Sequence, residues 1–370
     1  MHIAFIIVKN IMLGGGIEKL TYELGNRLVK RGQEVTVYSM KHYGDSHKEF
    51  GGIKIVRVPA IPMRATEKLS ASTFAAFHAF SQKKIPDIIH LHSVAAGAFA
   101  WMLNLRGAAC VIQMHGIEWK RSRWGIIGKS VLKFLEKWSL RRTPFCTAVS
   151  EQQCEFFSRE YGISAKYIPT GVEIKSKVPA QEIFKLGLKP KYYILFASRL
   201  VKEKGAHYLI PAFRKLNHDV KLVIAGDARG EEVYKEKLRH LAGDDKRIVF
   251  PGFVSGRLLE ELFSHALIYV QPSELEGKSI ALLEAMSYGN PCLVSDIPEN
   301  IETVGSEGKY FKNKDIQGLK EGLDWLLDNP GAAQNLGQRA KKRVKDKFSW
   351  DFVTKEFEDF YHEILNTKRI

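Results

Sequence analysis

Glu276 and Glu284 are the side chains whose type and spacing most directly suggest chemistry. Glu276 precedes the turn Gly277-Lys278-Ser279, and Glu284 lies in an apolar helix that we expect to begin near Ser279. A carboxylate on such a helix can accept hydrogen bonds from sugar hydroxyls, and the backbone N–H groups of residues 278–280 can hold a phosphate oxygen. Two glutamates at this spacing also occur by coincidence, which is the preferred interpretation of the pair taken alone.

A second group of candidates is cationic. Arg199 and Lys204 follow the first predicted strand of the second half of the chain, in the run ASRLVKEKG at residues 197–205. Arg199 can form two parallel hydrogen bonds to phosphate oxygens, and Lys204 can place a point charge beside them. A solvated charged loop is the usual interpretation of such a run. The position at the carboxyl end of a core strand favours a diphosphate site instead.

A turn of three glycines, Gly14-Gly15-Gly16, lies between the first predicted strand and its helix. Glycines let the backbone approach a ligand closely, and the N-terminus of a helix favours anions. The turn does not match G-x-G-x-x-G, which argues against a dinucleotide fold of the dehydrogenase type. An ordinary turn is an equally good interpretation of these glycines.

The candidate residues follow the ends of predicted strands. These strands belong to two series of strand–turn–helix units along the chain. The first series begins with the predicted strand 3–8 and includes a helix around residues 73–84; the second begins with the strand 192–197. Alternation of this kind indicates parallel sheets with helices on both faces, and ligands bind outside the carboxyl ends of their strands. We expect an α/β protein of two doubly wound Rossmann-like domains facing across a cleft. The expected boundaries are 1–170, 171–350 and a closing helix at 351–370 that returns to the first domain.

The composition excludes several classes of protein. The 370 residues are 45% hydrophobic and 26% charged, which is typical of a globular protein. Four cysteines without C-x-x-C spacing argue against a disulfide scaffold or a zinc ribbon, and we expect reduced cytosolic thiols. No run of about 18 apolar residues is present, so we expect no membrane span and a cytoplasmic protein. The net charge of +15 indicates an acidic partner: nucleic acid, an anionic membrane or a phosphate-bearing substrate.

The positive charge is concentrated in the first domain. Residues 1–170 hold 24 Lys and Arg against 12 Asp and Glu, and the stretch from Lys120 to Arg142 holds eight cations against Glu136 alone. Apolar residues alternate with these cations, so a helix here would carry an apolar stripe with a cationic flank. Such a helix suits the inner face of an anionic plasma membrane, where the protein would bind peripherally. The alternative is a surface helix whose stripe packs on the core. We expect no nucleic-acid partner, because no helix-turn-helix, RNA-binding or zinc motif is present.

Over nearly its whole length the chain resembles glycosyltransferase family four, a family of retaining GT-B enzymes. Residues 276–284 resemble its E-x7-E motif, and residues 198–205 resemble its GRLxxxKG motif with Ser198 in place of the usual glycine. Residues 14–18, 33–37, 86–92 and 348–350 resemble its glycine loop, second strand, PDxxHxH strand and closing helix. MHGIEWKRSRWG at 114–125 is similar to a stretch of bacterial polysaccharide glycosyltransferases, some of them described as rhamnosyltransferases.

The resemblance implies transfer of a hexose or deoxyhexose from a nucleotide-diphosphate-sugar to a saccharide or lipid-linked saccharide, with retention, in cell-surface polysaccharide biosynthesis. It implies that the first domain binds the acceptor and the second binds the donor. The implied catalytic residues are Glu276, His115, Arg199 and Lys204. The implied donor-binding residues are Gly15, Gly16, Arg199, Lys204, Phe253, Glu276, Gly277, Lys278, Ser279, Ile280 and Glu284.

The resemblance also gives each residue a role. Glu276 would contact the donor sugar, Glu284 the ribose, and the two cations would neutralise the leaving diphosphate. His115, after the fourth core strand, would lie near the reacting sugar. Phe253 would flank the base, with buried packing as an equal alternative.

No metal or other cofactor is expected, because no D-x-D pair stands in a suitable place. We favour front-face attack, in which the phosphate takes the proton of the acceptor, over double displacement through a carboxylate. The alternatives are another GT-B enzyme, namely a sugar-nucleotide epimerase or a phosphorylase, and a non-catalytic subunit. His90 and His92 are expected to face opposite sides of their strand, one of them in a structural role. Asp227 either borders the nucleotide or is an ordinary turn residue.

Overall fold

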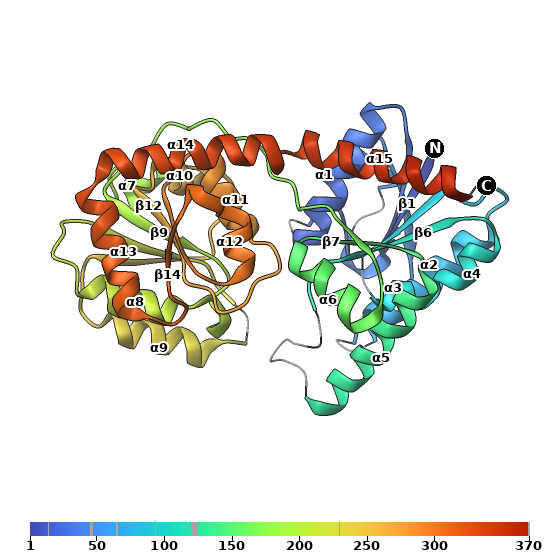
Figure 1. The fold of residues 1–370 in the computed structure, drawn as a ribbon, viewed down its shortest axis with the longest axis horizontal. Helices are drawn as coiled ribbons and strands as arrows, with labels where there is room; N and C mark the ends of the chain where they lie inside the picture. Colours follow the sequence, from blue (N-terminus) through green and yellow to red (C-terminus); the bar gives the residue numbers. More distant parts are fainter. Residues whose placement is uncertain are drawn as a thin grey trace. The chain divides into compact units, whose positions relative to one another are not determined.

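The computed structural model describes residues 1–13, 15–44, 47–63, 66–92, 94–117, 119, 125–228 and 230–368 (Figure 1). The chain divides into two compact units. Unit 1 consists of Met1–Gly171 together with Trp350–Ile370, and unit 2 is Val172–Ser349. These divisions lie one residue from the boundaries expected at 170 and 350.

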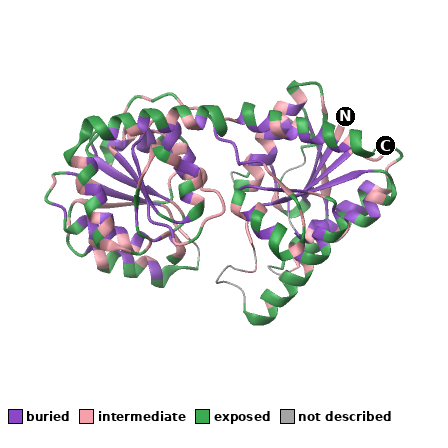
Figure 2. Ribbon diagram, viewed as in Figure 1, coloured by how far each residue is buried: buried purple, intermediate pink, exposed green. Residues whose placement is uncertain are grey.

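Unit 1 is built on an eight-stranded sheet in the order β3-β4-β2-β1-β5-β6-β7-β8. Its strands are parallel except for the edge pair of β3 and β4. The strands are β1 (His2–Val8), β2 (Glu34–Met40), β3 (Glu49–Phe50), β4 (Ile53–Val58), β5 (Ile88–Leu91), β6 (Ala109–Met114), β7 (Phe145–Ala148) and β8 (Ala165–Tyr167). The central strands are buried on both faces, as Figure 2 shows, because helices cover each side.

The helices of unit 1 form two layers. One layer is α1 (Gly16–Lys30) with the closing helix α15 (Trp350–Lys368), whose Phe357 and Tyr361 pack on the same core as Leu24. The other layer is α2 (Glu67–Ser81), α3 (Val94–Gly97), α4 (Ala100–Leu105), α5 (Ile126–Arg142) and α6 (Glu151–Tyr161). Helix α2 begins six residues before the expected start at residue 73. Its buried face already includes Ala71 and Ser72, so packing on the sheet extends the helix beyond the predicted stretch.

Unit 2 is built on a six-stranded parallel sheet in the order β11-β10-β9-β12-β13-β14. The strands are β9 (Tyr193–Ala197), β10 (Lys221–Ala225), β11 (Ile248–Gly252), β12 (Ile268–Gln271), β13 (Cys292–Ser295) and β14 (Lys309–Phe311). The helices are α7 (Glu182–Lys185), α8 (Ala206–Arg214), α9 (Glu232–Ala242), α10 (Gly256–His265), α11 (Ile280–Ser287), α12 (Pro298–Val304), α13 (Ile316–Asp328) and α14 (Pro330–Lys347).

Apolar clusters on both faces of this second sheet complete its core. One parallel sheet and one sheet that is parallel except at an edge, both with helices on both faces, confirm the predicted α/β class with two Rossmann-like domains. Within the described part of the chain, no helix is both long enough and apolar enough to cross a membrane.

Candidate functional site

Two loops of unit 2 meet at the carboxyl edge of its sheet. Strands β9 and β12 are parallel neighbours, so the loops that follow them begin at the same edge. The N–H of Glu274 donates to the carbonyl of Glu203, with a distance of 2.8 Å, and joins the two loops. Gly205 has φ of +74°, and a Cβ there would overlap the carbonyl oxygen of Pro272. Only glycine allows so close an approach, which explains why the cationic loop ends in one.

The meeting of these loops brings Lys204 against Glu276. The Lys204 Nζ lies 2.6 Å from Glu276 Oε2, and the two side chains are only 13% and 6% exposed. The hydroxyl of Ser273 donates to Glu276 Oε1 at 2.7 Å. Both carboxylate oxygens therefore have a partner, as a carboxylate this deeply buried requires. Two residues 72 positions apart, predicted from separate motifs, thus form one buried ion pair.

Arg199 is an accessible cation of this loop. Its side chain is 60% exposed, and its Nη2 lies 3.7 Å from Glu203 Oε1. An ion pair so open to water contributes little to stability. The guanidinium can therefore turn toward an anionic ligand at small cost to the fold.

The turn after Glu276 leads into helix α11. Ser279 is its N-cap: the Ser279 hydroxyl oxygen accepts from the N–H of Leu282 at 3.3 Å and donates to Gln271 Oε1 at 2.7 Å. This cap fixes the first turn of the helix, which starts at Ile280, beside the Lys204–Glu276 pair. The backbone here can contribute N–H groups to a phosphate, as the sequence suggests.

Lys278 uses its side chain inside unit 2. Its Nζ lies 2.6 Å from Glu302 Oε1 on α12 and 5.1 Å from the centre of the Phe348 ring, and the side chain is almost fully buried. This pair holds the turn to the helix behind it. Any contribution of Lys278 to a ligand therefore goes through its backbone.

Glu284 is half-buried on α11, between the buried side chains of Leu283 and Ala285. The pKa of Lys175 is raised chiefly by a hydrogen bond to Glu260, and the nearby negative charge of Glu284 also contributes to raising it. The predicted carboxylate on an apolar helix is therefore present in the structure.

Two other residues of unit 2 were singled out from the sequence; exposure decides the prediction for Phe253, and the alternatives for Asp227 stay open. Phe253 is 76% exposed directly after β11, so the alternative that it packs in the core is wrong. Asp227 accepts from Lys235 Nζ on α9 at 2.7 Å, which ties the turn to that helix.

His115 of unit 1 follows β6 and is half-buried. Its Nε2 lies 3.3 Å from Nδ1 of His92, a buried residue that follows β5. The expectation that His90 and His92 face opposite sides is wrong: their ring centres are 4.7 Å apart. Side chains two residues apart on a strand project to the same face. His90 is structural, bonded to the Tyr361 hydroxyl at 2.6 Å and to Gln113 Oε1 at 3.0 Å.

The glycine turn of unit 1 is described only in part. Gly15 is the N-cap of α1 and Gly16 its first residue, and both are exposed. A Cβ on Gly15 would overlap the Glu18 carboxylate, so that carboxylate folds back over the turn. Gly14 lies outside the described residues, as do Glu118 and residues 120–124 of the stretch 114–125.

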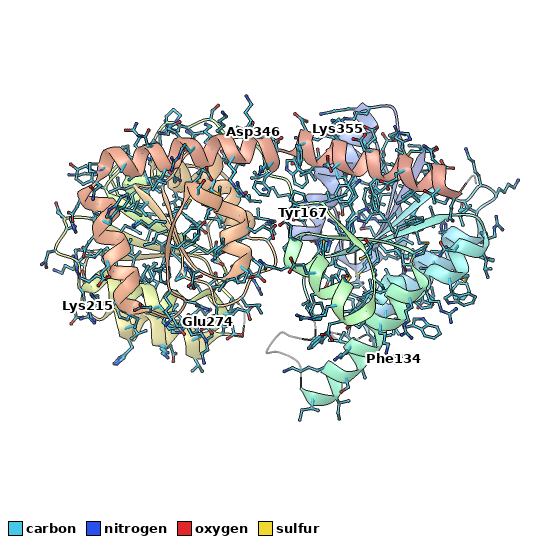
Figure 3. The ribbon with its side chains drawn as sticks, in the orientation of Figure 1. Phe134, Tyr167, Lys215, Glu274, Asp346 and Lys355 are labelled. Atoms are coloured by element: carbon cyan, nitrogen blue, oxygen red, sulfur yellow. The ribbon has the colours of Figure 1, made fainter. Side chains whose placement is uncertain are left out.

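Helix α5 contains the described part of the predicted amphipathic stretch. Ile126 is 87% exposed and Phe134, labelled in Figure 3, is 65% exposed. Ile127, Val131 and Trp138 are also exposed. The alternative that this stripe packs on the core is therefore wrong for most of its apolar side chains. The helix instead turns Ser139, Leu140 and the acidic Glu136 inward.

Sequence reasoning missed the partners that hold the predicted residues in place. Ser273, Gln271 and Glu302 each support the loop of Glu276, and Thr21 contacts His92. Ser273 lies within the motif stretch and could have been singled out. Gln271 ends β12 two residues before Ser273 and could have been singled out as well. Glu302 and Thr21 come from distant segments, and no local signal marks them.

The two units match two family models. Residues 14–176 match the model described as Glycosyltransferase Family 4, and residues 180–343 match the model described as Glycosyl transferases group 1. An uncharacterised glycosyltransferase of Methanocaldococcus jannaschii is 28% identical over 94% of both chains. A capsular polysaccharide biosynthesis glycosyltransferase of Staphylococcus aureus is 25% identical over 48% of each.

Solved structures agree with this assignment of fold. Sucrose-phosphate synthase from Thermosynechococcus elongatus superposes with a TM-score of 0.85 at 21% identity, over 99% of this chain and 100% of that one. The Anabaena protein HepE in complex with UDP-glucose superposes with a TM-score of 0.79 at 18% identity, over 98% and 100%. With both units matched, the chain is identified as a glycosyltransferase with the GT-B fold.

Proposed function

We propose that this glycosyltransferase moves a hexose or deoxyhexose from a nucleotide-diphosphate-sugar to a saccharide or lipid-linked saccharide, with retention of configuration. The observation that carries the proposal is the buried Lys204–Glu276 pair beside Arg199 and the start of α11. The pair offers a carboxylate to sugar hydroxyls and a cation to phosphate from the same sheet edge. The likeness of the fold to a protein solved with UDP-glucose supports a donor of this class.

In the proposed reaction the glycosyl–phosphate bond breaks and negative charge develops on the departing diphosphate. Arg199 and Lys204 stabilise that charge as fixed cations, and the N–H groups at the start of α11 add to them. These groups can carry the charge without a metal ion. Glu284 would accept hydrogen bonds from the ribose, and Phe253, exposed at the end of its strand, would lie along the base.

For the stereochemical course we propose front-face attack. Both oxygens of Glu276 are already engaged, one by Lys204 and one by Ser273. A carboxylate held in this way is a weak nucleophile, which disfavours a covalent glycosyl intermediate on Glu276. The departing phosphate would take the proton of the acceptor hydroxyl.

The donor is tested first by thermal denaturation with UDP-, GDP- and dTDP-sugars, because a bound donor raises the melting temperature. The sugar that shifts it is then offered with saccharide acceptors, and the anomeric configuration of the product is read by NMR. Glu276→Gln should abolish transfer. Glu274→Gln is the matched control: it alters a neighbouring acid with its own partner, Lys314 at 2.9 Å, and should retain transfer. Full transfer by Glu276→Gln would refute the site, and sugar turnover without a second saccharide would point to an epimerase or phosphorylase.

We further propose that unit 1 works at an anionic membrane surface, through the exposed face of α5. This face carries Lys129, Lys133, Lys137, Arg141 and Arg142 beside its apolar side chains. Glu136, the single acid of α5, is buried and accepts from Trp119 Nε1 at 3.0 Å and the Tyr161 hydroxyl at 2.8 Å. Every charged side chain on the exposed face of α5 is therefore a cation. Such a surface would repel a second copy of itself and attract acidic headgroups.

The neighbouring helix α4 extends the same surface. Asn104 Nδ2 donates to the carbonyl of Arg142 at 3.2 Å, which joins α4 to the end of α5. Trp101 and Leu105 of α4 are both exposed. Aromatic and aliphatic side chains flanked by cations are the groups that enter the headgroup region of a bilayer. A capsular polysaccharide biosynthesis glycosyltransferase among the relatives supports a role in polysaccharide biosynthesis.

Binding to phosphatidylglycerol vesicles tests the membrane proposal. Each cation near an anionic surface contributes about 1 kcal/mol, so Lys133→Gln with Lys137→Gln should weaken binding about 30-fold. Lys30→Gln with Lys215→Gln removes the same charge elsewhere and should have little effect. Binding that ignores lipid charge and salt would refute this proposal and leave the transferase proposal standing.

A further inference from the structure

His92 is held between Thr21 on α1 and His115 after β6. Its Nε2 lies 2.8 Å from the Thr21 hydroxyl oxygen, and its Nδ1 lies 3.3 Å from His115 Nε2. Thr21 and His92 are both buried, and the His92 ring stacks on Phe5 with a centroid distance of 5.6 Å. The three polar side chains form a chain of hydrogen bonds from the inside of unit 1 to the half-buried His115.

The proton positions in this chain follow from the backbone of α1. The Thr21 hydroxyl donates its single hydrogen to the carbonyl of Ile17, with a distance of 2.8 Å. Its oxygen must therefore accept from His92, which places a proton on His92 Nε2. A neutral imidazole carries one N–H, so His92 Nδ1 is an acceptor. His115 must then donate, which places a proton on His115 Nε2.

Burial supports a neutral His92. Together with the neighbouring His90 and His115 it holds the pKa of His92 well below its ordinary value, although a hydrogen bond to the Gln113 side chain acts in the opposite direction. His90 does not compete for the same atoms, because its own nitrogens bond to Tyr361 and Gln113. Thr21 therefore sets which group donates and which accepts in each hydrogen bond from Thr21 through His92 to His115.

We propose that Thr21 and His92 are positioning residues that hold the His115 ring in place with its proton on Nε2. The proposal rests on the proposed function, in which His115 lies near the reacting sugar. When the tautomer of an imidazole is fixed, the nitrogen that faces the substrate is always a donor or always an acceptor. The other tautomer exchanges these two roles, so the hydrogen bond to the substrate is lost.

Thr21→Val and Thr21→Ser form the matched test. Valine keeps the shape of threonine at a fully buried position but removes the acceptor for His92, and serine restores that acceptor. In Thr21→Val we expect kcat for the nucleotide sugar to fall about 10- to 100-fold, the range for residues that orient a functional imidazole. The KM for the donor should change less than about twofold, because donor contacts are kept. Thr21→Ser should retain most of the activity.

The tautomers are measured directly on the ligand-free protein labelled with 15N-histidine, with His115→Gln used to assign the His115 signals. In the wild type, the spectrum should show His115 protonated on Nε2. In Thr21→Val, it should show a mixture of the Nε2 and Nδ1 tautomers of His115. A wild-type His115 protonated on Nδ1 would overturn the proposal, as would an unchanged spectrum and rate in Thr21→Val. A changed spectrum with an unchanged rate would overturn the positioning role alone. If the wild type turns over no nucleotide sugar, the proposed function fails, and the spectra still decide the tautomer.

His92→Asn and His92→Gln provide a second comparison if Thr21→Val folds poorly. The amide oxygen of asparagine reaches the place of Nδ1 and can accept from His115. Glutamine reaches only the place of Nε2. We expect His92→Asn to transfer sugar about tenfold faster than His92→Gln. Equal rates in the two variants would contradict the proposal.

Discussion

Replacing Lys204 with methionine tests whether Glu276 depends on its buried partner. The two charged groups are 2.6 Å apart, with the side chains 13% and 6% exposed. Removing one member of a buried pair costs about 3–5 kcal/mol, because the other charge remains desolvated. Ser273 still donates to Glu276 at 2.7 Å, and neither side chain of the pair is completely buried. We therefore expect Lys204→Met to lower the free energy of unfolding by about 2–3 kcal/mol.

The expected loss is large enough to measure by thermal denaturation. For a unit of the size of Val172–Ser349, 1 kcal/mol corresponds to about 2–4 °C, so the melting temperature should fall by about 5–10 °C. The double variant Lys204→Met with Glu276→Gln removes the isolated charge and should recover at least half of the loss. Both variants should lack transfer activity.

Lys314→Met is the matched control for this experiment. Lys314 also pairs with a glutamate of the same loop, Glu274 at 2.9 Å, but its side chain is 56% exposed. An exposed pair contributes about 0–1 kcal/mol, so the melting temperature should change by at most about 4 °C. If Lys204→Met melts no lower than this control, the argument from burial is refuted.

Three further predictions concern the same unit. Gly205→Ala should reduce both stability and transfer, because a Cβ would overlap the Pro272 carbonyl. Gly230→Ala is the control, because Gly230 has a similar φ of +80° but open space around it, so this variant has the backbone strain without the overlap. Melting curves and transfer assays compare the two variants. Arg199→Ala should leave the melting temperature almost unchanged, since its ion pair is exposed, and should weaken UDP binding about tenfold in calorimetry. Burial opposes the charge of Glu261, but hydrogen bonds from backbone N–H groups and a guanidinium outweigh it and lower its pKa to about 2. The stability that its charge contributes is present above the unfolded pKa of about 4.5 and is lost as the pH falls toward 2, so Glu261→Gln should flatten the acid limb of a stability–pH curve.

Much of the fold could be predicted from the pattern of the sequence. Strands β1 and β9 begin within one residue of the predicted strands 3–8 and 192–197 and end where predicted, because short apolar runs between turn residues leave little choice of ends. Helix α2 starts earlier than predicted, because its first turns are held by packing and not by local sequence signals. The error at His90 and His92 was one of strand geometry, since side chains two apart share a face.

The candidate site was predictable in part for a related reason. Loops that follow parallel strands start at the same edge of the sheet, so motifs after β9 and β12 had to lie near each other. The spacing along the chain could not show that Lys204 touches Glu276, or that Lys278 turns away to Glu302. Those choices depend on the close approach that Gly205 allows and on the position of α12.

The sequence by itself determined the alternation of strands and helices, the excess of positive charge in the first half, and the residues that end the core strands. These are local properties, set by the order of residue types along the chain. Only the tertiary structure decided which side of α5 faces solvent, which carboxylate takes Lys204 as its partner, and which side chains contact the ring of His92. Each of these depends on a contact between segments far apart in the sequence, and the burial of polar groups makes the choice of partner energetically decisive.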